Sequence, residues 1–358
     1  MSSRRCTVAA VRRRSHSSAA STPPPVRIAG RDLEPTEVFD TYWRFADRRQ
    51  RIYLRRLSGH APPWSDDPIL HEHRFTNAYR AADRVSQFLI TDVIYGSNAT
   101  EDAEDTVFRV LLFKMFNKIE SWRALEDLVG GIRWRSFDYD RYRRAIDETA
   151  RRGPVYSAAY VIPPPRLGEP TKRLNHLRLL ERMMHDGIAT VVTDADNLRP
   201  VYERLRSYPS IGPFLAFQFS IDLNYTPLMD ASEDGFVVAG PGARDGIRKC
   251  FGPAAHGIES EVIRYMAETQ ELHFARLSLQ FPGLFGRRLQ LIDCQNLFCE
   301  VDKYARVAHP HVRGVSGRSR IKQRFRPLVD PLTALFPPKW QLASTTSSVP
   351  QQPTLFAS

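Results

Sequence analysis

Three acidic residues lie close together between two glycine–proline turns, and their carboxyl groups could do acid–base chemistry. Asp230, Glu233 and Asp234 fall within five positions, after the turn at 209–213 (PSIGP) and before the turn at 240–242 (GPG). Each turn predicts the start of a helix, because glycine followed by proline favours helix initiation. Helix starts present free N–H groups that bind phosphate. Carboxylates beside two such starts would suit chemistry on a nucleic acid.

Basic residues follow the second turn and could hold phosphate groups. The predicted contacts of this region are Gly212, Gly240, Gly242, Arg244, Arg248 and Lys249. A structural interpretation competes with each part, because glycine–proline turns are common in loops, apolar runs such as 214–223 suit a core, and acidic loops are usually solvated. The order of turn, helix, acids and basic helix favours the functional interpretation.

The chain has 358 residues, a net charge of +11 and an isoelectric point near 9.7. Such a basic excess favours polyanionic partners, either a nucleic acid or an anionic membrane surface. Because 42% of the residues are hydrophobic, the chain can also bury a large core. It has no apolar run of about 18 residues, so we expect no membrane-spanning helix and no membrane partner.

The cysteines are too few and too scattered for a disulfide framework, which predicts reduced thiols and an intracellular location. Cys294 and Cys299 do not form a CxxC pair, and no second pair completes a zinc site. We therefore expect no metal and no cofactor.

Helical spacing dominates the sequence, and almost nothing alternates with the period of a strand. A helix is expected over 36–57, with aromatic residues that suit a core and arginines that suit solvent or phosphate. A second helix is expected from the cap at 66–68 through Tyr95. Its residues at spacings of three or four would share a face that grips substrate or forms a polar seam between helices: His73, Asn77, Arg80, Arg84 and Gln87.

We predict a mainly α fold of two helical lobes in one domain, residues 32–328, with the triple proline at 163–165 as a candidate lobe boundary. Residues 1–31 are rich in arginine and contain no acid, which predicts a disordered basic arm. That arm could bind nucleic acid, direct nuclear import in a eukaryotic source or act as an organelle transit peptide. Residues 329–358 predict a disordered tail.

Polar residues interrupt the apolar pattern of a helix predicted over 283–304. Asp293, Asn296 and Glu300 would need buried partners there, so they indicate a polar seam or the wall of a site. Beyond this helix, basic residues alternate with glycines over 313–326, a pattern that suits phosphate contact.

Three stretches resemble the helical domain found with 5-hydroxymethyluracil DNA kinases. They are TYWRFADRRQRIYLRRLSGHAPPWSDDPILHEHRFTNAYRAADRVSQFLI, FVVAGPGARDGIRKCF and LQLIDCQNLFCEVDKYARV. The resemblance covers residues 36–326 and extends to the thymine-hypermodification systems that include α-glutamyl/putrescinyl-thymine pyrophosphorylase-like proteins. It implies an association with DNA that carries modified thymine or uracil, and a helical fold similar to that of helix-hairpin-helix DNA glycosylases.

The stretch 209–216 is similar to the hairpin of such glycosylases, with Ser210 in place of the first glycine. The resemblance implies an aspartate about twenty residues later that assists chemistry at a flipped nucleotide. Asp234, our first choice, and Asp230 fall in that window, and Asp293 is a candidate second acid of the site. Asp222 lies too close to the hairpin to fill this role.

The chain contains no GxxxxGK[ST] sequence, so it lacks the phosphate cradle of a P-loop kinase. We expect a DNA-binding protein that turns out a thymine-derived base, with substitution at the 5-methylene or base excision as candidate reactions. The alternatives are a non-catalytic module serving a separate kinase or transferase, and an RNA-binding protein whose aromatic residues stack bases.

Overall fold

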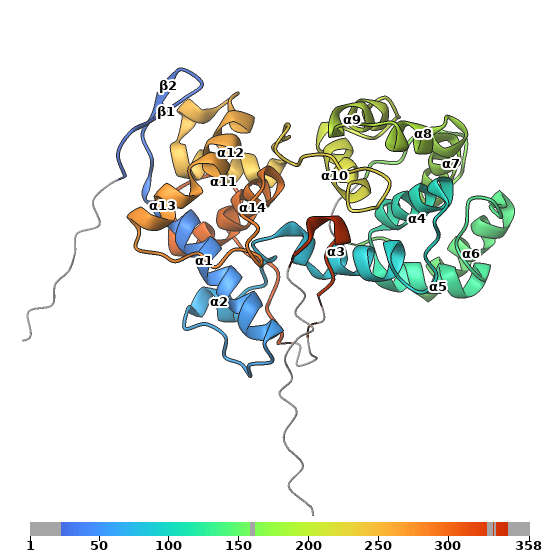
Figure 1. Ribbon diagram of the computed structural model, residues 1–358, viewed down its shortest axis with the longest axis horizontal. Coiled ribbons are helices and arrows are strands. Elements are labelled where there is room, and N and C mark those ends of the chain that lie inside the picture. Colours follow the sequence, from blue (N-terminus) through green and yellow to red (C-terminus); the bar gives the residue numbers. More distant parts are fainter. Residues whose placement is uncertain (1–22, 158–161, 328–331, 333, 343–358) are drawn as a thin grey trace, which may run out of the picture.

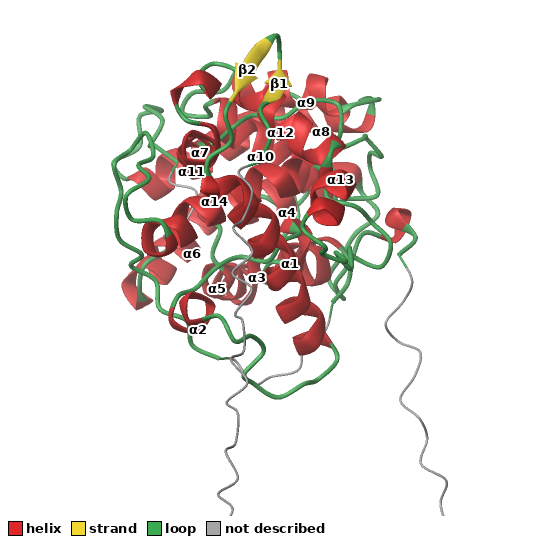
Figure 2. Cartoon of the chain, turned by 90° about the vertical axis from the view of Figure 1, so that its left-hand side faces the viewer, coloured by secondary structure: helices red, strands yellow, loops and turns green. Residues whose placement is uncertain are grey.

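The computed structural model describes residues 23–157, 162–327, 332 and 334–342. Helices form nearly all of the regular structure in these residues, and a small two-stranded hairpin lies at one end of the molecule (Figure 2). The mainly α prediction is confirmed.

The helices form two lobes that lie side by side (Figure 1). The first lobe contains β1 (Val26–Ile28), β2 (Arg31–Leu33), α1 (Glu37–Leu57), α2 (Pro68–Glu72), α11 (Pro241–Phe251), η3 (Pro253–Ala255), α12 (Glu259–Glu268), α13 (Gln270–Arg276) and α14 (Leu291–Ala308). The second lobe contains α4 (Ala103–Phe116), α5 (Ile119–Val129), α6 (Tyr139–Arg152), α7 (Lys172–His185), α8 (Ile188–Thr193), α9 (Leu198–Arg206) and α10 (Pro213–Leu223). The lobe boundaries therefore lie before α4 and after α10, and the triple proline at 163–165 lies within the second lobe.

Helix α14 is the centre of the first lobe, where it packs against α1, α11 and α12. It crosses α11 closely, because a β-carbon at Gly246 would stand 2.1 Å from the carbonyl oxygen of Phe298. The ring of Phe298 in turn lies 4.7 Å from the ring of Tyr42 on α1. This tight crossing fixes the start of α11 relative to the buried face of α14.

Helix α4 is the centre of the second lobe and is buried along nearly its whole length. Its start is capped by Asp102, which accepts a hydrogen bond from the backbone N–H of Asp105, and its end is a left-handed Asn117 with φ of 51°. The helix packs against α5, α7, α8 and α10.

Residues 23–31 are ordered, although the sequence placed them in a disordered arm. Ala29 and Gly30 both have positive φ, which is the backbone of a tight hairpin turn, and they join β1 to β2. Arg31 then anchors the hairpin by donating to the carbonyls of Ala254 and His256. The rest of the predicted arm, residues 1–22, lies outside the described residues, as does most of the predicted tail.

The long helix expected from residue 66 to Tyr95 does not form. Its chain runs through α2, an extended stretch, η1 (Arg80–Ala82), α3 (Arg84–Phe88) and a π-helix, η2 (Leu89–Ile94). The extended stretch begins at His73, which forms an antiparallel bridge with Arg324 of the basic segment 313–326. The helix expected from 283 is shorter than predicted, because it starts at Leu291.

Candidate nucleic-acid interface

The two glycine–proline turns each start a helix, as predicted. Gly212 is the N-cap of α10 and Gly240 the N-cap of α11, with φ and ψ of −76° and 172° and of −75° and 170°. Proline follows at the first helical position of both, and neither start has a side-chain cap. Backbone N–H groups in the first turn of a helix have no partner within the helix, so helix starts of this kind can bind an anion.

These two starts are neighbours, although they belong to different lobes. A β-carbon at Gly240 would stand 2.5 Å from the ring of Phe214, the second residue of α10. The absence of a side chain at Gly240 thus allows the two helix starts to meet where the lobes join. Gly242 has a packing role, because it faces Cys299 of α14.

The turn before α10 contains one residue with a left-handed backbone. Ser210 has φ of 67°, in the left-handed region that glycine adopts most easily. The turn joins α9 directly to α10, and the two helices pack against each other. A serine therefore takes the conformation for which the hairpin pattern normally uses glycine.

The three basic residues of α11 have different environments. Arg244 is exposed and Arg248 half-buried, and neither forms an ion pair within the described part of the chain. Lys249 is buried, and its ammonium lies 2.9 Å from the carboxylate of Asp302. Lys249 is thus held inside the fold by this ion pair, and it also lines the pocket beneath the segment 313–326.

The residues expected to share one face of a helix over 66–95 do not do so. Asn77 donates to the carbonyl of Ala82 and accepts from Arg49, so its amide is used inside the fold. Gln87 bonds the backbone of Leu335. Arg80 is buried, and Arg84 is exposed. Of this group, Arg84 is the side chain that solvent or a phosphate can reach.

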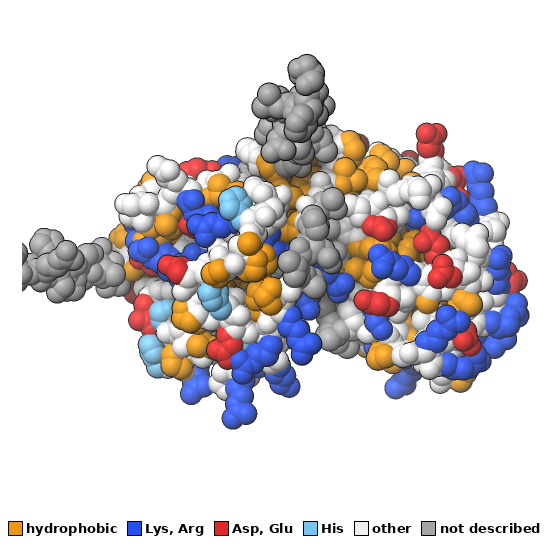
Figure 3. Space-filling model, turned by 90° about the horizontal axis from the view of Figure 1, so that it is seen from below, with side chains coloured by type: hydrophobic (Ala, Val, Ile, Leu, Met, Phe, Trp, Pro, Cys, Tyr) orange, Lys and Arg blue, Asp and Glu red, His pale blue; other side chains and the backbone are white. Residues whose placement is uncertain are grey.

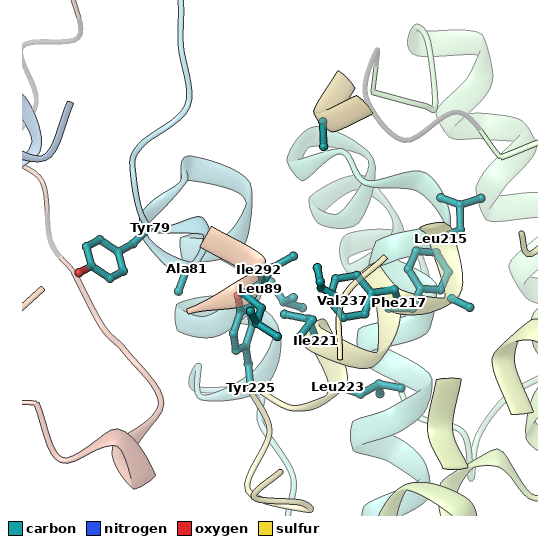
Figure 4. Close-up of a cluster of buried hydrophobic side chains, with 14 of the residues drawn as sticks. Tyr79, Ala81, Leu89, Leu215, Phe217, Ile221, Leu223, Tyr225, Val237 and Ile292 are labelled. Atoms are coloured by element: carbon teal, nitrogen blue, oxygen red, sulfur yellow. The ribbon is translucent and has the colours of Figure 1, made fainter. Parts of the chain in front are cut away.

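Arg80 belongs instead to a buried ion-pair network where the lobes join. Its guanidinium lies 2.8 Å from Asp222 of α10, and the ammonium of Lys114 of α4 lies 3.2 Å from the same carboxylate. Arg80 also donates to Gln218 and Tyr225. The apolar side chains around the joint include Leu89, Ile221 and Ile292 (Figure 4). Asp222 lies inside the apolar run of α10, and an acid in such a run indicates a buried partner.

The predicted catalytic acids are not brought together. Asp230 and Asp234 are exposed on the connection from α10 to α11. The backbone carbonyl of Asp234 accepts a hydrogen bond from Arg264 of α12. Asp293 is buried in the first turn of α14, where its two oxygens accept from the backbone N–H groups of Arg80 and Gln290. Burial raises the pKa of Asp293 to about 7, with a further contribution from nearby Glu233.

Glu233 is the buried acid of the cluster, which nothing in the sequence distinguished from its neighbours. One of its oxygens lies 3.2 Å from the guanidinium of Arg287, and burial raises its pKa despite this partner. The other oxygen accepts no hydrogen bond from any described residue. A buried acceptor without a donor is unusual in a folded protein.

The basic segment 313–326 is docked on the first lobe. Asp245 of α11 accepts hydrogen bonds from Ser316 and Arg318, which ties the segment to the helix that starts at Gly240. A pocket of about 210 Å³ lies beneath the segment, and its lining includes Arg306, whose Nε–H has no hydrogen-bond partner among the described residues. Lysine and arginine side chains lie on both lobes of the face seen in Figure 3, rather than in one stripe.

The described residues contain no group of three or more histidine, cysteine or acidic side chains that could hold a metal ion. No helix among them is long and apolar enough to cross a membrane.

The chain is similar to one protein family and to one phage protein. The family described as "5-hmdU DNA kinase, helical domain" matches residues 36–314. A protein of Bacillus phage SP10 named "5-hmdU DNA kinase" is 25% identical over 288 residues, which are 75% of this chain and 45% of that protein. The chain thus spans less than half the length of this relative. No solved structure matches the chain.

Proposed function

This chain belongs to the family of the 5-hmdU DNA kinase helical domain, and we propose that it binds DNA carrying 5-hydroxymethyluracil. The observation that carries the proposal is the meeting of two uncapped helix starts, at Gly212 and Gly240, where the lobes join. Backbone N–H groups at these starts would hold successive phosphates of one strand, a role that helix starts commonly fill.

Arginines near this joint would supply the charge that duplex binding requires. Arg244 follows the start of α11, and Arg84 is exposed on α3. The pocket that contains Arg306 would hold a phosphate beside the basic segment. The unit that binds DNA would be residues 32–328, and the joined α9, turn and α10 support the proposed likeness to helix-hairpin-helix proteins.

We assign phosphoryl transfer to a separate kinase or transferase, because this chain has no GxxxxGK[ST] sequence and the matching kinase is more than twice as long as the matched part. The chain would then recognise the modified base and present it to that partner. At fixed salt, the chain should bind a duplex that contains one 5-hydroxymethyluracil with a different affinity from the same duplex without it. Single-stranded RNA of the same sequence should compete poorly. Equal binding to all three would refute the proposal.

A catalytic role remains a second candidate, favoured by the position of Asp234. Its backbone is held by Arg264 while its carboxylate stays exposed where the lobes join. As a general base or nucleophile, this carboxylate would act at the 5-methylene or sugar of a turned-out nucleotide. Nucleoside mass analysis after incubation with modified DNA, with and without amines or nucleotides, tests this role. Asp234→Asn should abolish any conversion and leave DNA binding unchanged.

A further inference from the structure

The closing segment, residues 334–342, lies between the two lobes, where it is coloured red in Figure 1. Two contacts fix it. The ammonium of Lys339 donates to the carbonyls of Asn224, Thr226 and Met229 at the end of α10, and the backbone of Leu335 exchanges two hydrogen bonds with the amide of Gln87. A stretch that composition predicts to be disordered is therefore held at the lobe joint.

This segment places one aromatic ring against the buried polar groups of the joint. The guanidinium carbon of Arg287 lies 3.9 Å from the ring centre of Trp340. The ring of Tyr225 meets Trp340 edge-on at 5.8 Å, and the ring of Phe336 is nearly parallel to it at 6.2 Å. A flat ring is thus held by stacking against a cation and by two aromatic neighbours.

Arg287 forms an ion pair with a carboxylate that can accept one more hydrogen bond. Glu233 is buried, and Arg287 occupies one of its oxygens while the second accepts no hydrogen bond from the described residues. An indole ring in the Trp340 position has one N–H, whereas a uracil has an N–H flanked by two carbonyl groups. The open oxygen of Glu233 offers an acceptor for that N–H, and the face of Arg287 offers a cation on which the ring can stack.

We propose that Glu233, Arg287 and Tyr225 form a binding site for a uracil-type pyrimidine base, and that Trp340 of the closing segment occupies this site in the free protein. The base would stack on the guanidinium of Arg287 in place of Trp340 and give its N3–H to the open oxygen of Glu233. The proposal deepens the proposed function, on which its biological meaning rests, because it names the residues that would receive a turned-out base.

The closing segment would then control access to the site. The base and Trp340 cannot occupy the same position. The apparent affinity for a base is therefore the intrinsic affinity of the open site multiplied by the fraction of molecules in which the segment has left. A variant that releases the segment should bind more tightly, by about tenfold if the segment is open about one-tenth of the time.

The test measures binding of the nucleoside 5-hydroxymethyl-2′-deoxyuridine to the full chain by calorimetry. Trp340→Ala and, independently, Lys339→Ala should each increase affinity by about tenfold. Glu233→Gln in the Trp340→Ala background should remove the gain in affinity. The amide has one acceptor oxygen in place of two, so a residue 233 that accepts from N3–H of the base no longer pairs with Arg287. Arg144→Ala, an exposed change on α6 of the second lobe, is the matched control and should leave affinity at the wild-type value.

Two results would overturn the inference: nucleoside affinity unchanged in both release variants, or a gain that survives Glu233→Gln. Thermal melting of each variant tests whether it folds. If Trp340→Ala unfolds, Lys339→Ala still tests the inference, because it keeps the aromatic side chains of the segment. Salt-dependent binding of unmodified duplex DNA is measured in parallel. That binding tests the proposed function separately, because it depends on the arginines and helix starts rather than on Glu233.

Discussion

The backbone of Gly240 lies against the ring of Phe214, so close that a β-carbon at residue 240 would stand 2.5 Å from the ring. This contact joins the starts of α10 and α11 across the two lobes. We predict that Gly240→Ala forces the starts apart and destabilises the fold by about 1–3 kcal/mol, the usual effect of overpacking. Urea unfolding measures the stability, and DNA binding by the folded variant should weaken as well.

Gly212→Ala is the matched control for that change. Gly212 is also an N-cap before proline, with nearly the same backbone angles, but nothing lies within 4 Å of a β-carbon placed there. Both substitutions replace an N-cap glycine with alanine, so they share any loss of N-cap preference. The difference between the unfolding free energies of the two variants therefore reports the Phe214 contact. Equal stability of the two variants would show that the joint yields easily and does not fix the helix starts.

Asp222 holds two buried cations where the lobes join, and its removal should be severe. Asp222→Asn leaves Arg80 and Lys114 without their carboxylate, which predicts a loss of about 3–5 kcal/mol in the free energy of unfolding. Asp230→Asn, on an exposed side chain, should change it by less than about 0.5 kcal/mol. A small effect of Asp222→Asn would mean that water enters the joint.

Arg244 and Arg248 should contribute charge to DNA binding without reading the base. We predict that Arg244→Ala and Arg248→Ala each weaken binding of modified and unmodified duplex alike, and each reduce the slope of log K against log salt by about 1. Arg144→Ala on α6, an exposed arginine at the far end of the second lobe, should leave the slope unchanged. Equal effects at all three positions would indicate diffuse binding over the whole basic surface.

Asp293 should make stability fall as the pH rises toward neutrality. Its pKa is raised to about 7 in the fold because of burial, so the folded protein holds a proton that the unfolded chain releases above its ordinary carboxyl pKa near 3.9. The stabilisation present at low pH is therefore lost between about pH 4 and 7, by up to about 1.4 kcal/mol per pH unit.

The comparison of wild type with Asp293→Asn isolates this residue, because Asp83, with a pKa also raised to about 7, and the buried histidines titrate in both proteins. Urea unfolding between pH 5 and 7 should show a steeper loss of stability in wild type than in the variant. Parallel curves would show that Asp293 is ionised throughout, as its two backbone hydrogen bonds favour.

Local signals in the sequence predicted the elements that position the site. Thr36 caps α1 and the two glycine–proline pairs start α10 and α11, because each cap acts within a few residues of its own helix. Asp67 likewise caps α2 as expected. Helix starts that carry such a signal were therefore predicted closely, whereas the helix expected from 283 starts later, at Leu291.

The failures have a common physical cause in partners that are distant in sequence. Residues 73–88 have helical spacing, but Arg80 pairs with Asp222 and Asn77 with Arg49, and these buried contacts outweigh local helix preference. The proline-rich end predicted a disordered tail, yet Lys339 and Trp340 hold part of it against α10. Glu233 and Asp234 are adjacent in sequence, and no pattern showed which carboxylate would be buried.

The most direct measurement compares two duplexes that are identical except for one base pair, thymine–adenine in one and 5-hydroxymethyluracil–adenine in the other. Fluorescence anisotropy at fixed salt would give both affinities for the wild-type chain. The account predicts tighter binding of the modified duplex, by about 1–3 kcal/mol, the range of one well-read base contact. Equal affinity for the two duplexes would contradict recognition of 5-hydroxymethyluracil by this chain.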